Sequence, residues 1–292
     1  MKETYRMRLI KSMIAAALAA LCILAASGCC GFSFSDGNTV SSSIDSDSQK
    51  DRIIRSKSFP EGLLSAQDFE SEDFDSTVVI ADVSSWTGEI DFAAAKEKGI
   101  SGVVIRLARY NLSLDKKFLD NYKSAKAAGL PVGCYYFSGA NSAEDALNEA
   151  QTVLDIIREN TLEFELPVFF DVEDDGSNNI NTLSRQTVTD IVDAFCGFLC
   201  KNGILSGYYA SHSFADNNMY SSQLRDYPFW IAEWTYEIKA DMYKNVFLWQ
   251  YTSELSVTGM EEKCDGNRPL RDIVTYTKDF KESFKKLIDE KE

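Results

Sequence analysis

Two carboxylic acids stand two residues apart at the end of an apolar segment, in the stretch Leu166-Pro167-Val168-Phe169-Phe170-Asp171-Val172-Glu173. The segment is rich in residues that favour β-structure, so it predicts a buried strand with Asp171 and Glu173 at its end. Strand side chains alternate, which would place both acids on one face with Cα atoms about 6.6 Å apart. Two half-buried carboxyls cannot both ionise easily, so one should retain a proton near neutral pH, as glycosidic bond cleavage requires. The spacing alone is equally that of a solvated acidic turn or a cation site.

The elements that would position these acids follow an alternating pattern from residue 77 onward. Strands are predicted at 77–83, 102–107, 131–137, 166–172 and 206–210, with helices between them at 92–98, 115–128, 143–159 and 187–202. Strand-like segments at 229–234 and 246–251 then follow without long helices between them. Five βα units followed by plain strands predict an α/β fold, a TIM-like (β/α)5(β)3 barrel that forms a single catalytic domain.

Charged and aromatic residues gather where the predicted strands end. In βα barrels this end of the strands carries the site. The residues at these ends are Asp82, Arg106, Tyr136, Asp171, Glu173 and Tyr209. Their convergence favours a catalytic site over a solvated acidic turn.

The N-terminus predicts export of the protein. Basic residues precede a short apolar run at 13–26, and small residues follow it, which is typical of a signal peptide at 1–28. The run is short for a membrane span. Ala26-Ser27-Gly28-Cys29 resembles a bacterial lipobox, so we expect lipidation of Cys29 and an extracytoplasmic protein that is either membrane-anchored or secreted.

Residues 29–75 are rich in Ser and Asp, which predicts a disordered tether between the anchor and the barrel at 76–292. A fragment that begins near Ser76 should then fold by itself. The formal net charge is −15, and about −18 without the signal peptide. This charge argues against nucleic acid and polyanionic wall polymers as partners and is compatible with a neutral or locally cationic glycan.

Metal and nucleophile chemistry find few candidate residues. The chain has a single histidine, His212, which excludes a two-His metal site and argues against a Ser-His triad. The oxygen-ligand spacing of an EF-hand is also absent, so we expect neither a metal nor another cofactor. Four cysteines fall in the predicted domain, Cys134, Cys196, Cys200 and Cys264, and their spacing leaves the disulfide state open.

An ordered set of motifs resembles the family 25 glycoside hydrolases, the lysozyme-type N-acetylmuramidases. The set covers nearly all of residues 77–270 and includes Asp82-Val83-Ser84, Gly133-Cys134-Tyr135-Tyr136-Phe137, Phe170-Asp171-Val172-Glu173, Trp249-Gln250-Tyr251 and Asp265-Gly266-Asn267. The chain departs from the family pattern at Tyr136, where His is common, and at Gly266, where a hydrophobic residue is usual. An acidic run at 261–263 replaces an expected glycine, which leaves the place of Asp265 open.

The resemblance implies roles for four carboxylates. Glu173 corresponds to the general acid, and Asp171 to the residue that supports the developing positive charge, directly or through the N-acetyl group of the substrate. Asp82 and Asp265 would complete an acidic floor. Tyr136, Tyr209, Trp234 and Tyr251 could stack on sugars or fill the barrel, and Arg106 could pair with the floor or contact substrate.

These observations predict a monomeric peptidoglycan hydrolase that cleaves the β-1,4 bond between N-acetylmuramic acid and N-acetylglucosamine. Its partners would be peptidoglycan glycan strands and, through the lipid anchor, the membrane. Two alternatives remain at this stage. One is another N-acetylhexosaminidic glycosidase, such as a chitinase-like enzyme, and the other is a non-catalytic glycan-binding lipoprotein.

Overall fold

The computed structural model describes residues 56–70, 77–110, 113–173, 176, 178–235, 238 and 244–290. The predicted signal peptide, Cys29 and most of the predicted tether lie outside these residues. Among the helices of the described residues, none combines the length and the hydrophobicity that crossing a membrane requires.

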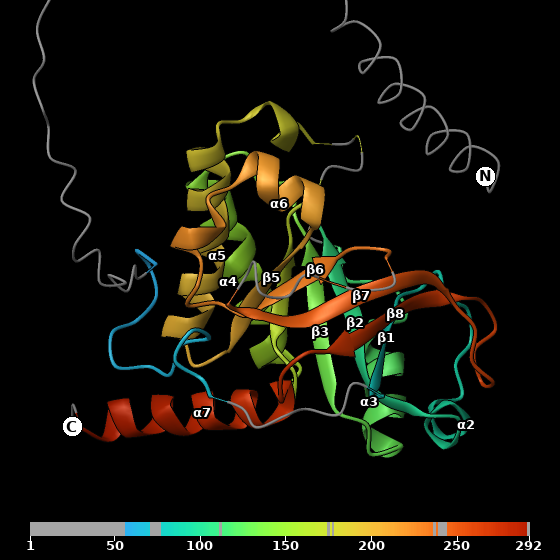
Figure 1. The fold of residues 1–292 in the computed structure, drawn as a ribbon. Helices are drawn as coiled ribbons and strands as arrows, with labels where there is room; N and C mark the ends of the chain where they lie inside the picture. Colours follow the sequence, from blue (N-terminus) through green and yellow to red (C-terminus); the bar gives the residue numbers. More distant parts are fainter. Residues whose placement is uncertain are drawn as a thin grey trace, which may run out of the picture. The chain divides into compact units, whose positions relative to one another are not determined.

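Eight strands close into a barrel in the order of the sequence (Figure 1). They are β1 (Val79–Val83), β2 (Ile100–Arg109), β3 (Val132–Phe137), β4 (Val168–Asp171), β5 (Ser206–Ser211), β6 (Phe229–Ala232), β7 (Val246–Leu255) and β8 (Cys264–Pro269). Neighbours from β1 to β7 are parallel, whereas β8 is antiparallel to both β7 and β1. The (β/α)5(β)3 prediction is confirmed. The last strand is reversed because a short connection without a crossover can only join antiparallel neighbours.

Helices follow each of the first five strands. They are α2 (Phe92–Glu97), α3 (Phe118–Ala127), α4 (Ala143–Glu159), α5 (Arg185–Lys201) and α6 (His212–Asn218), with short 3-10 turns η1 (Ile180–Thr182) and η2 (Ser221–Gln223). The side chains of Asp91, Ser142, Ser184 and Ser211 accept backbone N–H bonds at the starts of α2, α4, α5 and α6. These are the residue types that cap helices best, so the sequence sets where four of the five helices begin.

The barrel interior is filled mainly by aromatic rings. Trp230 packs edge-on against Phe169, Tyr135 and Tyr209, with ring centroids 5.2, 5.9 and 4.6 Å away. Gly207 permits this packing, since a Cβ there would lie 2.2 Å from the Pro228 carbonyl oxygen and 3.0 Å from the Phe169 ring.

The interior is closed by a buried amide on β8. Asn267 is fully buried, accepts the Trp230 indole N–H at 2.8 Å and donates to the Ile80 carbonyl at 3.0 Å. Asn267 therefore joins the reversed strand to β1 and β6.

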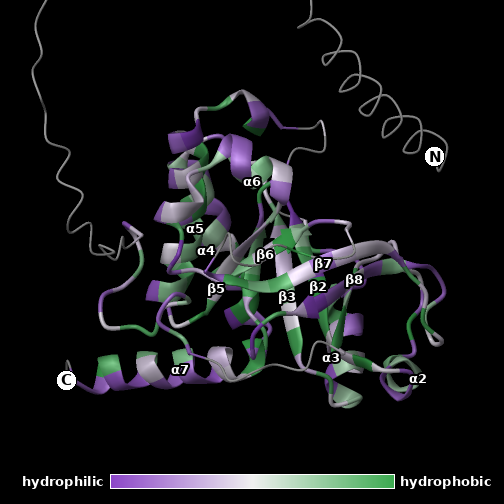
Figure 2. Ribbon diagram, in the orientation of Figure 1, coloured by the Kyte–Doolittle hydropathy of each residue, from purple (hydrophilic) through white to green (hydrophobic). Residues whose placement is uncertain are grey.

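A further helix at the C-terminal end of the described residues, α7 (Ile273–Asp289), was not among the predicted elements. Its buried residues are Ile273, Tyr276, Thr277 and Phe280, which recur at the helical period along one face. Figure 2 shows the resulting alternation of hydrophobic and hydrophilic residues along α7. The helix therefore packs through an apolar stripe.

Residues 56–70, which we call the N-terminal strap, pack against the domain beside α7 (Figure 1). Leu63, Ala66 and Phe69 are buried, and the Phe69 ring lies 5.0 Å from that of Tyr276 and 5.9 Å from that of Phe247. The expected tether boundary at residue 75 is therefore wrong for this stretch. Its few apolar residues are enough because they pack against apolar side chains of β7 and α7.

Candidate active site

Asp171 and Glu173 lie at the end of β4. Asp171 is the last residue of the strand and is buried, while Glu173 lies two residues beyond it and is partly exposed. The strand is thus one residue shorter than predicted at this end. The Glu173 N–H donates to Asp171 Oδ1 at 3.4 Å, and Glu173 Oε1 accepts the Ser211 N–H at 2.5 Å. Ser211 ends the neighbouring strand β5, so the barrel itself orients Glu173.

Asp82 and Asp265 form a second pair of acids. They are directly opposite one another on the antiparallel strands β1 and β8. Burial, followed by the charges of Asp265 and Asp171, raises the pKa of Asp82 well above its usual value, against the lowering effects of Arg106 and a Tyr135 hydrogen bond. Burial and then the Glu254 charge raise the pKa of Asp265 to about 6. The reversal of β8 explains why an acid at the start of a strand joins acids at the ends of others.

Tyr209 lies among all four acids. Burial and then the charges of Glu173, Asp171, Asp265 and Asp82 raise the pKa of its hydroxyl well above the usual value. The hydroxyl is therefore a neutral donor, and it donates to Gln250 Oε1 at 3.1 Å. The four sequence-predicted carboxylates thus converge on one end of the barrel.

Arg106 pairs with a different acid. Its guanidinium donates to Asp115 Oδ2 through Nη2 at 2.6 Å and Nε at 3.0 Å, and to the Ser85 hydroxyl at 3.2 Å. Burial opposes ionisation of Asp115, yet hydrogen bonds from Lys117 and Arg106 leave its pKa below the usual value. Arg106 therefore stabilises the loop after β1. Its charge also lowers the pKa of Asp82 by a coulombic interaction.

The other predicted sugar-binding aromatics have different surroundings. Trp234 is 59% exposed just after β6, and its indole N–H reaches Gln250 Oε1 at 3.4 Å. Tyr251 is partly exposed and lies under the guanidinium of Arg268, 4.7 Å from the ring centre. Of these two, only Trp234 is joined to the acidic site by a hydrogen-bonding neighbour.

Tyr136 lies on the other side of the barrel wall from the acids. It is fully buried and stacks on Phe195 of α5 with ring centroids 6.0 Å apart. It occupies the layer between sheet and helices, so of the two roles that the sequence left open, packing fits its position and sugar stacking does not. Its neighbour Tyr135 faces the interior and hydrogen-bonds Asp82.

Strand parity could have found Tyr135. In the β3–β4 pairing, Tyr135 is opposite Phe169 and Tyr136 is opposite Phe170. Residues paired across neighbouring strands face the same side. Asp171 is two residues from Phe169, so Tyr135 shares its face and Tyr136 does not.

Sequence reasoning also missed Gln250, which contacts the acids, and the exposed Trp86. Gln250 of β7 is buried and contacts Asp265, Tyr209 and Trp234. Trp86 lies in the loop after β1 and is 70% exposed. Trp86 could have been found from its position four residues after Asp82. Gln250 could have been found from its place in the Trp249-Gln250-Tyr251 motif.

The four cysteines of the domain are buried free thiols. In the described part of the chain, no group of three or more His, Cys, Asp or Glu residues is arranged to hold a metal ion. The Nδ1 atom of His212 lies 3.1 Å from Glu233 Oε2, and its Nε2 atom lies 3.2 Å from Asp216 Oδ2. His212 is therefore beside the site but outside the cluster of four acids.

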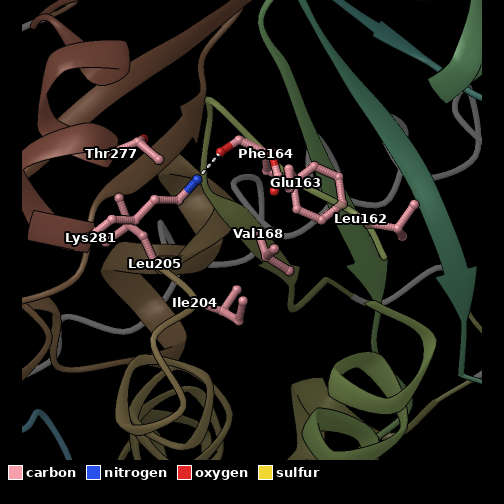
Figure 3. A pocket seen from close by; sticks show the side chains of 8 residues that line it. All are labelled: Leu162, Glu163, Phe164, Val168, Ile204, Leu205, Thr277 and Lys281. Atoms are coloured by element: carbon pink, nitrogen blue, oxygen red, sulfur yellow. Dashed lines mark hydrogen bonds between the residues drawn. The ribbon is translucent and has the colours of Figure 1, made fainter. Parts of the chain in front are cut away.

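A separate cavity lies at the opposite end of the barrel (Figure 3). Phe164, Leu205 and Val168 line it, and Val168 is the first residue of β4 whereas Asp171 is the last. Lys281 of α7 donates to the Phe164 carbonyl there at 2.5 Å. This cavity therefore belongs to the base of the fold and not to the acids.

A closed eight-stranded barrel with acids gathered at one end is the architecture of barrel glycoside hydrolases. Residues 81–260 match the glycosyl hydrolases family 25, and the chain belongs to this family. The matched range includes Asp82, Asp171 and Glu173, while Asp265 lies just beyond it.

Two lysozymes are similar in sequence. The autolytic lysozyme of Clostridium acetobutylicum is 29% identical over 184 residues, which cover 63% of this chain and 53% of that protein. Lysozyme M1 of Streptomyces globisporus is 24% identical over 201 residues, covering 64% and 66%. The chain thus spans between about half and two thirds of the length of these relatives.

Solved structures share the fold. The lysozyme from Streptomyces coelicolor aligns with a TM-score of 0.60 at 21% identity, covering 72% of this chain and all of that chain. The modular autolysin LytC from Streptococcus pneumoniae, in complex with a synthetic peptidoglycan ligand, aligns with a TM-score of 0.59 at 21% identity, covering 70% and 49%.

Proposed function

We propose that this protein hydrolyses the β-1,4 bond between N-acetylmuramic acid and N-acetylglucosamine in peptidoglycan. Family membership supports this activity, as do the two lysozymes that match in sequence. The observation that carries the proposal is the convergence of four carboxylates around Tyr209 at one end of the barrel.

Glu173 is the proposed general acid. The Ser211 N–H occupies Glu173 Oε1, which leaves Oε2 to carry the proton that passes to the leaving glycosidic oxygen. Because that N–H belongs to the backbone at the end of β5, it orients the carboxyl without mobile side chains.

Asp171 is the proposed partner of the positively charged transition state. Buried at the end of β4, it would stabilise the developing oxocarbenium ion directly or orient the N-acetyl group of the substrate. Asp82 and Asp265 are the proposed floor of the site, where burial and their mutual charge raise the pKa of Asp82.

We place sugar contacts at Tyr209 and at the exposed indole of Trp234, with Trp86 as an added candidate. Tyr251 is a weaker candidate because Arg268 covers its ring. Arg106 has an indirect role: its hydrogen bond to the Ser85 hydroxyl holds the loop that carries Trp86. Aromatic faces suit the apolar faces of sugar rings.

Digestion of purified peptidoglycan tests the proposal, with chitin as the competing substrate and mass spectrometry of the new reducing ends. We expect muropeptides that end in N-acetylmuramic acid and little soluble product from chitin. Preferential release of chitin fragments would indicate a different N-acetylhexosaminidic glycosidase. Binding without turnover on either polymer would indicate a glycan-binding protein.

We also propose that Cys29 carries a lipid that anchors the protein outside the cytoplasm. The support is the lipobox-like sequence Ala26-Ser27-Gly28-Cys29, and cell-wall lysis is an extracytoplasmic activity. Metabolic labelling with a fatty-acid probe should mark the wild-type protein and not the Cys29→Ser variant. A label that remains on the variant would exclude this anchor.

A further inference from the structure

Gln250 makes three side-chain hydrogen bonds at the centre of the site. The residue is 1% exposed on β7, between β6 and β8. Its Nε2 donates to Asp265 Oδ2 at 3.1 Å, and its Oε1 accepts from the Tyr209 hydroxyl at 3.1 Å and the Trp234 indole at 3.4 Å. One buried amide therefore touches a floor acid, an interior ring and an exposed ring.

The chemistry of the neighbours fixes the orientation of this amide. An indole N–H can only donate, so Trp234 must face the amide oxygen, and an ionised carboxylate can only accept, so Asp265 must face the NH2 group. Flipping the amide would set donor against donor and acceptor against acceptor. Gln250 is thus a directional link between groups of opposite hydrogen-bonding character.

We propose that Gln250 is a positioning residue that sets the acidic floor and the aromatic rim as one unit, through Asp265 on one side and Tyr209 and Trp234 on the other. The side chain of Gln250 would then fix the position of a sugar stacked on Trp234 relative to the floor acids. The inference rests on the proposed roles of Asp265 and Trp234 and adds a residue to them.

The charges around Asp265 make its hydrogen bond from the Gln250 amide important for its ionisation. The titratable groups that interact with Asp265 are Asp82 on β1, Tyr135 on β3, Tyr209 on β5, Glu254 on β7 and Cys264 beside it on β8. The charges of Asp82 and Glu254 oppose the ionisation of Asp265, whereas the Gln250 N–H favours it. Removing that donor should shift the titration of Asp265 to higher pH.

Gln250→Glu is the sharpest variant, because it preserves length and both acceptor contacts. When the new carboxyl is protonated, its O–H can still donate to Asp265. When it is ionised, two carboxylates meet within hydrogen-bonding distance and repel. We expect peptidoglycan turnover close to wild type near pH 5 and a loss of at least about tenfold by pH 8.

Gln250→Met removes donor and acceptors together while it keeps the volume of the side chain. Its kcat should fall about tenfold or more at every pH, and KM should rise because Trp234 loses its partner. Gln151→Met is the matched control, since Gln151 also donates to an Asp, at 2.8 Å, but on the exposed surface of α4. The control should keep the wild-type pH profile.

Melting temperature against pH gives a readout that needs no turnover. The Gln250→Glu protein should lose melting temperature relative to wild type as pH rises from 5 to 8, and Gln151→Met should not. A pH-independent loss of activity in Gln250→Glu, with a melting curve parallel to wild type, would overturn the proposal. If wild type itself fails to cut peptidoglycan, the proposed function fails, while the melting comparison still decides whether Gln250 sets Asp265.

Discussion

Partly or fully buried carboxylates occur in two regions of this molecule, and their surroundings differ. At the site, Asp82 and Asp265 face each other across β1 and β8, and the pKa of each is raised. Under the N-terminal strap, Asp226 accepts the Ser56 N–H at 2.5 Å and the Gln67 amide at 2.8 Å. The first pair faces like charge and accepts one donor each, from Tyr135 and Gln250, whereas Asp226 accepts two donors from the strap.

Asp193 follows the pattern of Asp226. It accepts the Ser58 N–H at 3.0 Å and the Tyr227 hydroxyl at 2.9 Å. Burial of a carboxylate is therefore not a mark of function by itself. The acids under the strap serve to fasten it, whereas burial and like charge raise the pKa of the acids at the site.

Removing the strap should have the largest effect. A fragment of residues 76–292 should lose cooperative thermal unfolding, because Phe247 and Tyr276 would be uncovered and Asp193 and Asp226 would lose donors. Truncating one buried Phe already costs about 3–5 kcal/mol, against a total stability of about 5–15 kcal/mol.

Circular dichroism melting of fragments 56–292 and 76–292 makes this comparison. The longer fragment should melt as the full chain does. Equal melting temperatures of the two fragments would show that the strap is only a tether.

Glu173→Gln should have the next largest effect, on activity alone. It keeps the acceptor for the Ser211 N–H and removes the proton donor, so turnover of peptidoglycan should fall by at least about 10²-fold. The melting temperature should hold. Glu159→Gln, at an exposed position on α4, is the control. A folded Glu173→Gln protein with near-normal turnover would exclude the acid role.

Asp265→Asn should change how stability depends on pH. The pKa of Asp265 is raised from 3.8 to about 6, so the folded protein binds the proton more tightly than the unfolded chain does. Its contribution to stability is therefore present below pH 4 and is lost as pH rises through 6. The variant should be more stable than wild type at pH 7, by about 1–3 kcal/mol, and the gap should close toward pH 4.

Urea unfolding at pH 4 and pH 7 measures this gap, with exposed Asp120→Asn of α3 as the control. A gap that is the same at both pH values would show that the folded protein does not raise the pKa of Asp265.

Lys57→Ala should have the smallest effect. Lys57 pairs with Asp190 at 2.7 Å, but the side chains are 67% and 40% exposed, and such ion pairs contribute little. The melting temperature should stay within experimental error of wild type, in contrast to Phe69→Ala in the same strap. A loss comparable to that of Phe69→Ala would mean that surface charge, not burial, holds the strap.

The sequence by itself determined the barrel and its acids, because both depend on local patterns. Alternation and helix-capping residues mark the elements, and Asp82, Asp171 and Glu173 stand at or just beyond strand ends that any parallel barrel brings together. The family motifs carried Asp265 as well. These features can be predicted without knowing any contact between distant segments of the chain.

The tertiary structure decided what depends on partners from elsewhere in the chain. Register across β3 and β4 set Tyr135 facing inward and Tyr136 outward, and the reversal of β8 brought Asp265 to the acids. Gln250 acquired its contacts only when three strands closed around it. The strap looked like a tether because its apolar residues are few, and it folds because Phe247 and Tyr276 supply the surface that those residues cover.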